Sequence, residues 1–435
     1  MTRDVRLASD RGSRPPSNPD GVLPRLLLGR PAAGPATLRE HLDRHGELPR
    51  VVRRGDGEAL IAEVERAGLR GRGGGAFPTG RKLRAVRAAG RAPVVVANGT
   101  EGEFASAKDK VLLAQAPHLV LDGAVLAAEM VGATDAVVVV HQEVRAIVDA
   151  ARAERTVAGT ERVRLHVLTA ADGFVAGEAS AVVHWVERGV PLPRRTPPRL
   201  AERGLRGRPT LVQNVETLAH VALIGRHGAE WFRAVGTSDE PGSMLVTLAG
   251  ALRRPGVYEI EIGVSLDEVL DAAGGASSPL SALLLGGYFG TWIRASAAAG
   301  LAFSSAGLAP SGSAVGAGLI VALPADACGL VETARVARYL ASSSAGQCGP
   351  CVFGLDAIAG ELERAATGES FDLERLRRWL DQVDGRGACR HPDGVVRFVR
   401  SCLDAFGDEI DQHRAGWCCG TQPEPVLPVP FRPRS

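Results

Sequence analysis

All seven cysteines of this 435-residue chain lie in its last quarter. One pair, Cys348 and Cys351, lies in the sequence Gly-Gln-Cys-Gly-Pro-Cys, and Cys389 follows it. We expect no secretory signal here, and thiols gathered in one region of such a long chain are typical of a metal or iron–sulfur site rather than of a disulfide scaffold. We therefore predict such a centre here. The pair precedes a predicted helix, whose dipole favours thiolates and an anionic cluster.

The remaining cysteines carry weaker signals. Cys328 precedes a predicted helix and is expected to be a small buried side chain. Cys418 and Cys419 are adjacent in a tail with several prolines, and adjacent cysteines rarely serve one tetrahedral site. We expect no function for this pair, with redox sensing as the alternative.

A glycine-rich segment over residues 68–82 is the second candidate for chemistry. Glycines let a backbone approach a phosphate or a ring closely, and Arg72 and Lys82 supply positive charge beside them. The segment runs into a predicted helix N-terminus, which favours anions. It is not a dinucleotide-binding fingerprint, because a helix rather than a strand precedes it. A plain flexible loop is the alternative interpretation.

Three further segments have polar residues where a ligand could bind. The first, residues 96–103, follows a buried strand and contains Asn98 and Glu101. Ligands of open α/β sheets bind at such strand ends. The others are residues 174–178, ending in Gly177 and Glu178, and residues 208–218, which contain Asn214. Each segment alone could equally be a surface turn.

The elements around these residues follow from their apolar patterns. We predict helices over 58–69, 81–89 and 118–131 and strands over 94–97, 136–140 and 162–168, which together indicate a parallel α/β sheet. Strands over 244–249, 256–262, 282–285 and 319–323, with a capping box at 265–268, indicate a small α+β domain. Helices over 330–341, 352–366, 373–383 and 395–406 indicate a bundle.

Length and composition agree with several soluble domains. We predict a flexible segment at 1–50, an α/β domain at 51–238, a small domain at 239–326, a helical bundle at 327–412 and a tail at 413–435. The net charge of +2 indicates no nucleic-acid partner, and no apolar run is long enough to insert into a membrane. We expect a cytoplasmic protein. Only three of the 51 basic residues are lysines, and all three lie between residues 82 and 110, which suggests that a compact ammonium is needed there.

Taken in order, the four segments and the cysteines resemble the FMN-carrying, NADH-binding subunit of respiratory complex I and its relatives in NAD-linked hydrogenases and formate dehydrogenases. The resemblance covers about residues 55–410. It implies an FMN-binding α/β domain, a β-grasp domain of the soluble-ligand-binding type and a helical bundle with a [4Fe–4S] cluster. It implies electron transfer from NADH to FMN and then to the cluster.

The same resemblance assigns site residues. The loop that holds FMN corresponds to Gly71, Arg72, Gly73, Gly74 and Lys82, and an aromatic beside the adenine corresponds to Phe77. Other flavin-site or nicotinamide-site positions correspond to Asn98, Gly177 and Asn214, and Glu101 and Glu178 are the candidates for positioning the donor.

This chain departs from the family pattern at several positions. Thr100 and Ala179 stand where the family has carboxylates, and Ala85 and Arg199 stand where it has aromatic residues. Ala345 stands where it has the first cluster cysteine.

Three thiolates remain for the cluster, Cys348, Cys351 and Cys389, whereas a cubane normally takes four. A [3Fe–4S] cluster, a [4Fe–4S] cluster completed by His391 or Cys402, and a site without metal are the three interpretations.

We therefore expect an NADH dehydrogenase-like flavoprotein oxidoreductase that moves electrons between a donor, FMN and a cluster. The donor is NAD(H) or a protein, and a ferredoxin or another redox protein subunit is the expected partner. An NADPH-preferring reductase using Arg199 is a further option. The alternative from another class is a family relic that acts as a binding module without cofactors.

Overall fold

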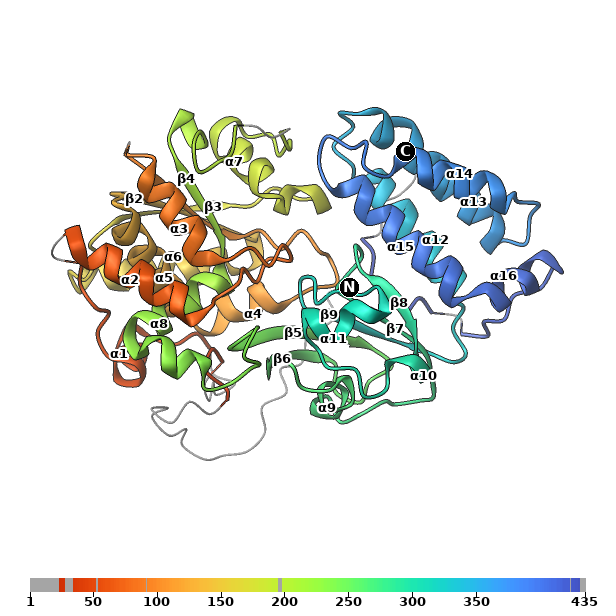
Figure 1. The fold of residues 1–435 in the computed structure, drawn as a ribbon, viewed down its shortest axis with the longest axis horizontal. Coiled ribbons are helices and arrows are strands. Elements are labelled where there is room, and N and C mark those ends of the chain that lie inside the picture. Colours follow the sequence, from red (N-terminus) through yellow and green to blue (C-terminus); the bar gives the residue numbers. More distant parts are fainter. Residues whose placement is uncertain are drawn as a thin grey trace.

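The computed structural model describes residues 23–27, 34–51, 54–90, 92–194, 198–422 and 424–430. Figure 1 shows three regions: an α/β region from the N-terminal half, a small mixed sheet beside it, and a helical bundle at the C-terminal end. This arrangement confirms the predicted fold class.

A four-stranded parallel sheet forms the centre of the first region. Its strands are β1 (Val94–Gly99), β2 (Asp135–Val140), β3 (Arg164–Thr169) and β4 (Thr210–Asn214). The order is β3-β2-β1-β4, so the chain moves outward in one direction from β1 to β3 and then places β4 on the other side of β1. The carboxyl ends of β1 and β4 therefore form a topological switch point, where open α/β sheets bind ligands.

Helices cover both faces of this sheet. They are α1 (Leu38–His45), α2 (Arg54–Ala67), α3 (Thr79–Ala88), α4 (Lys108–Gln115), α5 (Pro117–Val131), α6 (Gln142–Val157), α7 (Ala179–Arg188) and α8 (Val215–Arg233), with short 3₁₀ turns η1 (Phe174–Gly177) and η2 (Leu205–Gly207). Alternate strand residues face opposite sides: Val95 and Ala97 pack under α5 and α8, while Val94 and Val96 pack with α7. Strands buried on both faces are expected to be continuously apolar, as these are in the sequence.

The second region is a five-stranded mixed sheet. Its strands are β5 (Ser243–Gly250), β6 (Gly256–Glu261), β7 (Leu280–Leu285), β8 (Thr291–Arg294) and β9 (Leu319–Pro324), in the order β6-β5-β9-β7-β8. The connections contain α9 (Leu266–Ala272), α10 (Ala295–Ala298), α11 (Ser305–Leu308) and η3 (Ala309–Ser311). The predicted capping box forms at Ser265 and Glu268 and starts α9.

The third region is the bundle. Its elements are α12 (Gly329–Ser342), the π-helical turn η4 (Pro350–Gly354), α13 (Leu355–Ala366), α14 (Leu373–Val383), α15 (His391–Ala405) and α16 (Gly407–Arg414). The four predicted helices are present, and α16 was not predicted. One apolar cluster joins the bundle to the second sheet, because Trp292 of β8 packs with Phe398 of α15.

Both chain ends contain described residues that are packed. Residues 1–22 and 28–33 of the predicted flexible segment lie outside the described part. Leu26 is buried, and the backbone N–H groups of Arg25 and Leu26 donate to Glu259 at 2.8 and 2.7 Å. Residues 25 and 26 of this segment are thus packed against the second sheet. In the tail, Leu427 is buried against the bundle.

Within the described residues, no single helix is long and apolar enough to cross a membrane. The bent pair α4 and α5 would reach the required length and composition together, with 97° between the two helices. Nearly every residue of α5 is buried in the protein core.

Candidate functional site

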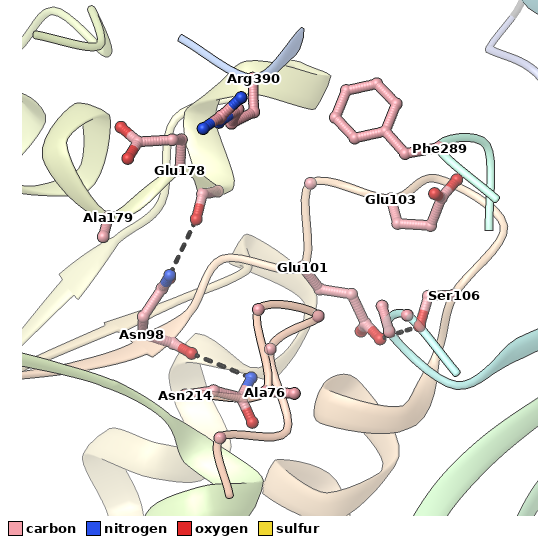
Figure 2. A pocket seen from close by; sticks show the side chains of 18 of the residues that line it. Ala76, Asn98, Glu101, Glu103, Ser106, Glu178, Ala179, Asn214, Phe289 and Arg390 are labelled. Atoms are coloured by element: carbon pink, nitrogen blue, oxygen red, sulfur yellow. Dashed lines mark hydrogen bonds between the residues drawn. The ribbon is translucent and has the colours of Figure 1, made fainter. Parts of the chain in front are cut away.

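A cavity of about 640 Å³ opens between the three regions. The residues that line it come from the glycine-rich loop, the ends of β1 and β4, the turn before α7, the second sheet and the start of α15 (Figure 2). Those predicted to bind the cofactor or the donor are Gly71, Gly73, Gly74, Phe77, Lys82, Asn98, Glu101, Gly177, Glu178 and Asn214. Of the predicted cluster ligands, Cys389 lines the same cavity.

The glycine-rich loop is a tight connection between α2 and α3. The Gly71 N–H donates to the Phe77 carbonyl at 3.0 Å, and the Thr79 N–H donates to the Leu69 carbonyl at 2.9 Å. Gly74 has a φ of 96°, a conformation that favours glycine. A Cβ on Gly73 would lie 3.2 Å from the Asn214 Cβ, so the loop backbone lies close to the end of β4.

Arg72 has a different position from its neighbours in the loop. It is buried and is not among the residues lining the cavity. Its guanidinium donates to the Ser243 carbonyl at 3.1 Å and to the Arg70 carbonyl at 3.3 Å, and its backbone N–H donates to Thr217 at 2.8 Å. Arg72 thus ties the loop to α8 and β5, and direct cofactor contact by this side chain remains only a prediction.

Lys82, on the first turns of α3, reaches the cavity wall below the loop. Its Nζ donates to the Val212 carbonyl at 2.5 Å and lies 3.5 Å from Gln213 Oε1. Burial lowers the pKa of Lys82 to about 8, while the Glu178 carboxylate raises it in part. The Lys82 ammonium therefore has few partners and lies beside a cavity where an anionic ligand could bind to it.

Asn98 and Asn214 face each other as register partners at the ends of β1 and β4. The Asn98 amide donates to the Gly177 carbonyl at 2.9 Å (Figure 2). The Asn214 side chain accepts from the Glu216 N–H at 3.0 Å, capping α8, and donates to Asp109 at 2.6 Å. The Asn98 amide thus connects the end of β1 to the turn before α7, and the Asn214 amide connects the end of β4 to α4.

Glu101 and Glu178 each cap a helix at the edge of the cavity. Glu101 accepts from Ser106 Oγ at 2.6 Å and from the first N–H groups of α4 at Asp109 and Lys110, at 3.1 and 3.0 Å. Burial, and then the neighbouring Asp109, raise the pKa of Glu101. Glu178 accepts from the Ser180 N–H at 2.8 Å as the N-cap of α7. Their carboxylates are thus fixed in place beside the cavity.

Two acidic side chains of this site, Glu103 and Glu216, lie in motifs of the sequence but were given no role there. Burial, and then the charge of Glu101, raise the pKa of Glu103 to about 8, although the Tyr288 N–H donates to it at 2.9 Å. Glu216 is buried and bonds Lys108 Nζ at 2.8 Å. The Asn-Val-Glu-Thr-Leu motif contained Glu216, but only the structure shows its partner.

The turn before α7 approaches the residues after β1 very closely. A Cβ on Gly102 would overlap the Phe174 carbonyl oxygen, and one on Gly177 would lie 3.1 Å from the Gly102 nitrogen. Gly102 therefore requires glycine, and a side chain at Gly177 would fit only if its neighbour shifted slightly. The Phe174 ring then packs against Phe289 of the second region, with ring centroids 4.5 Å apart and ring planes tilted by 55°, and both rings contact His391 of the bundle.

The three predicted cluster ligands lie in two neighbouring loops of the bundle. Cys351 is in the turn η4 and Cys389 precedes α15. Although burial raises it, the pKa of Cys348 is held below its usual value because backbone N–H groups of Ala388 and Cys351 donate to its sulfur. Burial raises the pKa of Cys351 to about 12 and also raises that of Cys389.

The two proposed substitutes for a fourth ligand differ in position. His391 is buried and lines the cavity beside Cys389; its Nε2 bonds the Leu340 carbonyl at 2.9 Å, and its buried Nδ1 has no partner among the described residues. Cys402 is on the same helix eleven residues further, about 16 Å along the axis. Cys402 is therefore too far from Cys389 to complete its cluster.

Several family positions that carry other residues here lie outside the cavity. Ala85 is exposed on α3, and Arg199 is exposed; neither is among the lining residues. Phe289 of the second sheet does line the cavity, and sequence reasoning missed it because no motif marks it. Figure 2 shows Phe289 across the cavity from Glu178. Arg390 also lines the cavity, and its guanidinium donates to Asp393 at 2.9 Å.

Comparison with known proteins yields matches over the three regions. Residues 64–223 match the family profile described as the Nuo51 FMN-binding domain, residues 245–285 match the SLBB domain, and residues 332–413 match the NADH-ubiquinone oxidoreductase-F iron-sulfur binding region. The last match contains Cys348, Cys351 and Cys389.

The chain is also similar to individual proteins. It is 32% identical to the F 2 subunit of NADH-quinone oxidoreductase of Rhizobium meliloti, over 84% of this chain and 91% of that protein. It is 32% identical to the F subunit of NADH-quinone oxidoreductase of Mycobacterium tuberculosis, over 85% and 88%. Among solved structures, a chain of an NAD+-reducing [NiFe]-hydrogenase in the H2-reduced state matches with a TM-score of 0.76 and 32% identity. That match covers 86% of this chain and 65% of the hydrogenase chain.

Proposed function

Because this chain belongs to the family of NADH-quinone oxidoreductase F subunits, we propose that it is an electron-transfer flavoprotein that uses FMN and an iron–sulfur cluster. The observation that carries the proposal is a single cavity lined by the glycine-rich loop, Asn98, Asn214 and Cys389. This cavity is large enough for a flavin and lies next to a thiol site. FMN, when bound, supplies the ability to accept an electron pair and release the electrons singly.

The residues around the cavity suit FMN. The Gly75 position has open space around it, so the loop backbone can lie directly against a phosphate or a ring. Lys82 supplies a positive charge next to that loop. Gln213 lines the cavity, and its buried Nε2 has no hydrogen-bond partner among the described residues, which leaves it free to donate to a ligand.

We further propose that Cys348, Cys351 and Cys389 hold the cluster. Backbone N–H groups already donate to these sulfurs, as is common where thiolates carry the charge of a cluster. His391 supports a four-iron cluster, since its unpartnered Nδ1 is buried beside Cys389. If His391 does not bind a fourth iron, the three cysteines suit a three-iron cluster.

The donor and the partner belong to the same proposal. We propose that NAD(H) exchanges electrons at this cavity, with the rings of Phe77 and Phe289 offering stacking surfaces and Glu178 positioned at its edge. Ala179 stands there in place of a carboxylate of the family pattern. We propose that a ferredoxin or another redox protein subunit is the partner on the cluster side and that the protein acts in the cytoplasm, where thiols stay reduced.

Anaerobic purification followed by absorbance and low-temperature EPR spectroscopy tests the proposal. We expect bound FMN and an iron signal. A signal in the oxidised protein that vanishes on reduction identifies three irons, and a signal that appears only on reduction identifies four. A colourless protein would overturn the proposal in favour of a binding module without cofactors.

Two variants separate the cofactors. Cys351→Ser should lose the iron signal and keep FMN, because Cys351 lies in η4 and is not among the residues that line the cavity. Cys402→Ser is the control, since this thiol belongs to neither site, and it should keep both. Loss of iron in both variants would contradict the ligand assignment.

A further inference from the structure

Four side chains that the proposed function does not use meet at the far end of the bundle. Cys328, His413, Cys418 and Cys419 place one ligand atom each within 4.8 Å of all the others. Cys328 is the N-cap of α12, His413 is in the last turn of α16, and the cysteine pair follows α16. The sequence separates Cys328 from the other three, so only the fold brings them together.

The donor atoms of this cluster face one another. Cys328 Sγ lies 3.3 Å from His413 Nε2. Three thiols and one imidazole are the donors of a common type of structural zinc site. Cys328 and His413 are buried, while Cys418 is exposed and gives the site access to solvent. Although adjacent cysteines rarely serve one tetrahedral site, the thiols of both Cys418 and Cys419 lie within 4.8 Å of the other two donor atoms here, so all four side chains are available to one ion.

The distances between the donor atoms indicate which metal centre fits the site. A tetrahedral zinc ion with Zn–S bonds of about 2.3 Å holds its sulfurs roughly 3.8 Å apart. That separation is compatible with donor atoms that all lie within 4.8 Å of one another. An iron–sulfur cubane places a cage of iron and sulfide between its thiolates and needs them further apart. Soft thiolates also disfavour magnesium and calcium, which prefer oxygen ligands.

Surrounding groups orient the ligands as metal sites require. Backbone N–H groups donate to the sulfurs, from Val331 to Cys328 at 3.4 Å and from Gly420 to Cys418 at 3.4 Å. The His413 ring also bonds the Ala365 backbone. A second bond of this kind fixes the orientation of a metal-binding imidazole.

The tail passes close to this site. A Cβ on Gly420 would lie 2.9 Å from the Cys328 nitrogen, so only a glycine lets the chain pass so close. The tail continues along the bundle, where the Thr421 N–H donates to the Asp326 carbonyl at 2.8 Å and the Leu427 N–H donates to Glu332 at 2.9 Å.

We propose that Cys328, His413, Cys418 and Cys419 bind one structural zinc ion that fastens the C-terminal tail to the start of α12. The fastened tail reaches the second sheet, where the Tyr288 hydroxyl donates to the Pro428 carbonyl. The neighbour of Tyr288, Phe289, lines the cavity. The zinc site therefore secures a segment that supports one wall of the cofactor cavity.

Metal analysis of the purified full-length chain, after dialysis against a weak chelator, tests this proposal. The comparison uses the wild type, Cys418→Ser and Cys348→Ser, all expressed with added zinc. We expect about one zinc per chain in the wild type and in Cys348→Ser, and at least a fivefold loss in Cys418→Ser. Cys418 is exposed, so its substitution by serine leaves the core intact.

Iron, measured in the same samples, separates this proposal from the proposed function. Iron should fall in Cys348→Ser and stay unchanged in Cys418→Ser. A wild-type chain without zinc, or a Cys418→Ser chain that keeps its zinc, would overturn the zinc site whatever the iron content.

Cobalt provides an independent readout. Cobalt added to the metal-depleted Cys348→Ser chain should give the long-wavelength absorption of a tetrahedral thiolate site, and His413→Gln in the same background should weaken it. Equal spectra from the two chains would count against His413 as a ligand and against the site as proposed.

Discussion

Glu103, the last residue of the 96–103 segment, shows how tertiary packing makes a side chain chemically distinctive. It lies in the wall of the cavity and its backbone partner, Tyr288, comes from the second region. Burial is the main cause of its raised pKa, and the charge of Glu101 adds to it. A carboxyl that stays protonated near neutral pH can donate as well as accept a hydrogen bond within a ligand site.

The raised pKa of Glu103 predicts a pH dependence of stability. The folded chain keeps a proton up to about pH 8 that the unfolded chain releases near 4.5, so rising pH through this window lowers stability. Glu103→Gln should remove this loss of stability, so at pH 8 its free energy of unfolding should exceed that of the wild type by up to about 4 kcal/mol. Thermal unfolding of both proteins between pH 5 and 8 measures it, and parallel curves would contradict the prediction.

Lys82 and Lys110 test whether a lysine is needed at the cavity. The compact ammonium of Lys82 donates to the Val212 carbonyl and lies near Gln213, a geometry that a planar guanidinium does not reproduce. Lys82→Arg should weaken FMN binding about tenfold, equivalent to ~1.4 kcal/mol. Lys110→Arg is the matched control, since Lys110 Nζ lies 3.9 Å from Glu143 and is absent from the cavity wall. Flavin fluorescence titration gives both affinities, and equal losses would contradict the assignment.

At the scale of elements, close helix packing sets the position of the strand ends. Gly123 of α5 lies directly against Leu218 of α8, and a Cβ there would overlap the Leu218 carbonyl oxygen. The N-terminus of α8 carries Asn214 as its cap and Glu216 in its first turn. The close approach of α5 to α8 therefore determines where Asn214 and Glu216 lie.

Two helix-interior glycines give a matched test of that packing. Gly123→Ala should destabilise the protein by about 3 kcal/mol, because the backbone of α8 must move away. Gly360→Ala in α13 meets only an arginine side-chain atom at 3.6 Å, and it should stabilise by about 0.5–1 kcal/mol through the ordinary advantage of alanine in a helix. Denaturant unfolding of both variants measures the difference, and a loss of similar size in both would refute the packing argument.

At the scale of the whole molecule, the cavity exists because three regions meet. Phe174 belongs to the α/β region, Phe289 to the second sheet and His391 to the bundle, and their rings contact one another. Gly394 of α15 makes room for the Phe289 ring, because a Cβ there would overlap it. The junction places the thiol site beside the cavity.

Removing the central ring of this junction should affect both stability and electron transfer. Phe289→Ala should cost about 2 kcal/mol and slow reduction of the cluster by NADH, because the bundle loses a contact that positions it. Phe353→Ala removes a ring that is 74% exposed and should change neither property. Unfolding and stopped-flow measurements on both variants check this, and an unchanged rate in Phe289→Ala would argue against a positioning role.

Much of the fold could be predicted from the chain because its signals are local. The apolar run at β1 and the capping box at Ser265 each depend on neighbouring residues only. The assignment of Gly73, Lys82 and Asn98 rested on motifs, and the structure places all three around one cavity. The partners of Arg72, Glu103 and Glu216 could not be predicted, since they come from distant parts of the chain.

The sequence by itself determined the order of three structural regions, the glycine-rich loop and a thiol pair, because backbone preference and apolar periodicity are properties of short segments. Only the tertiary structure decided which polar groups become neighbours. It turned Arg72 away from the cavity, left His391 Nδ1 without a partner among the described residues and assembled Cys328 with His413 and the tail cysteines. These outcomes depend on how buried surfaces pack across long separations, and packing determines burial, charge and ligand geometry together.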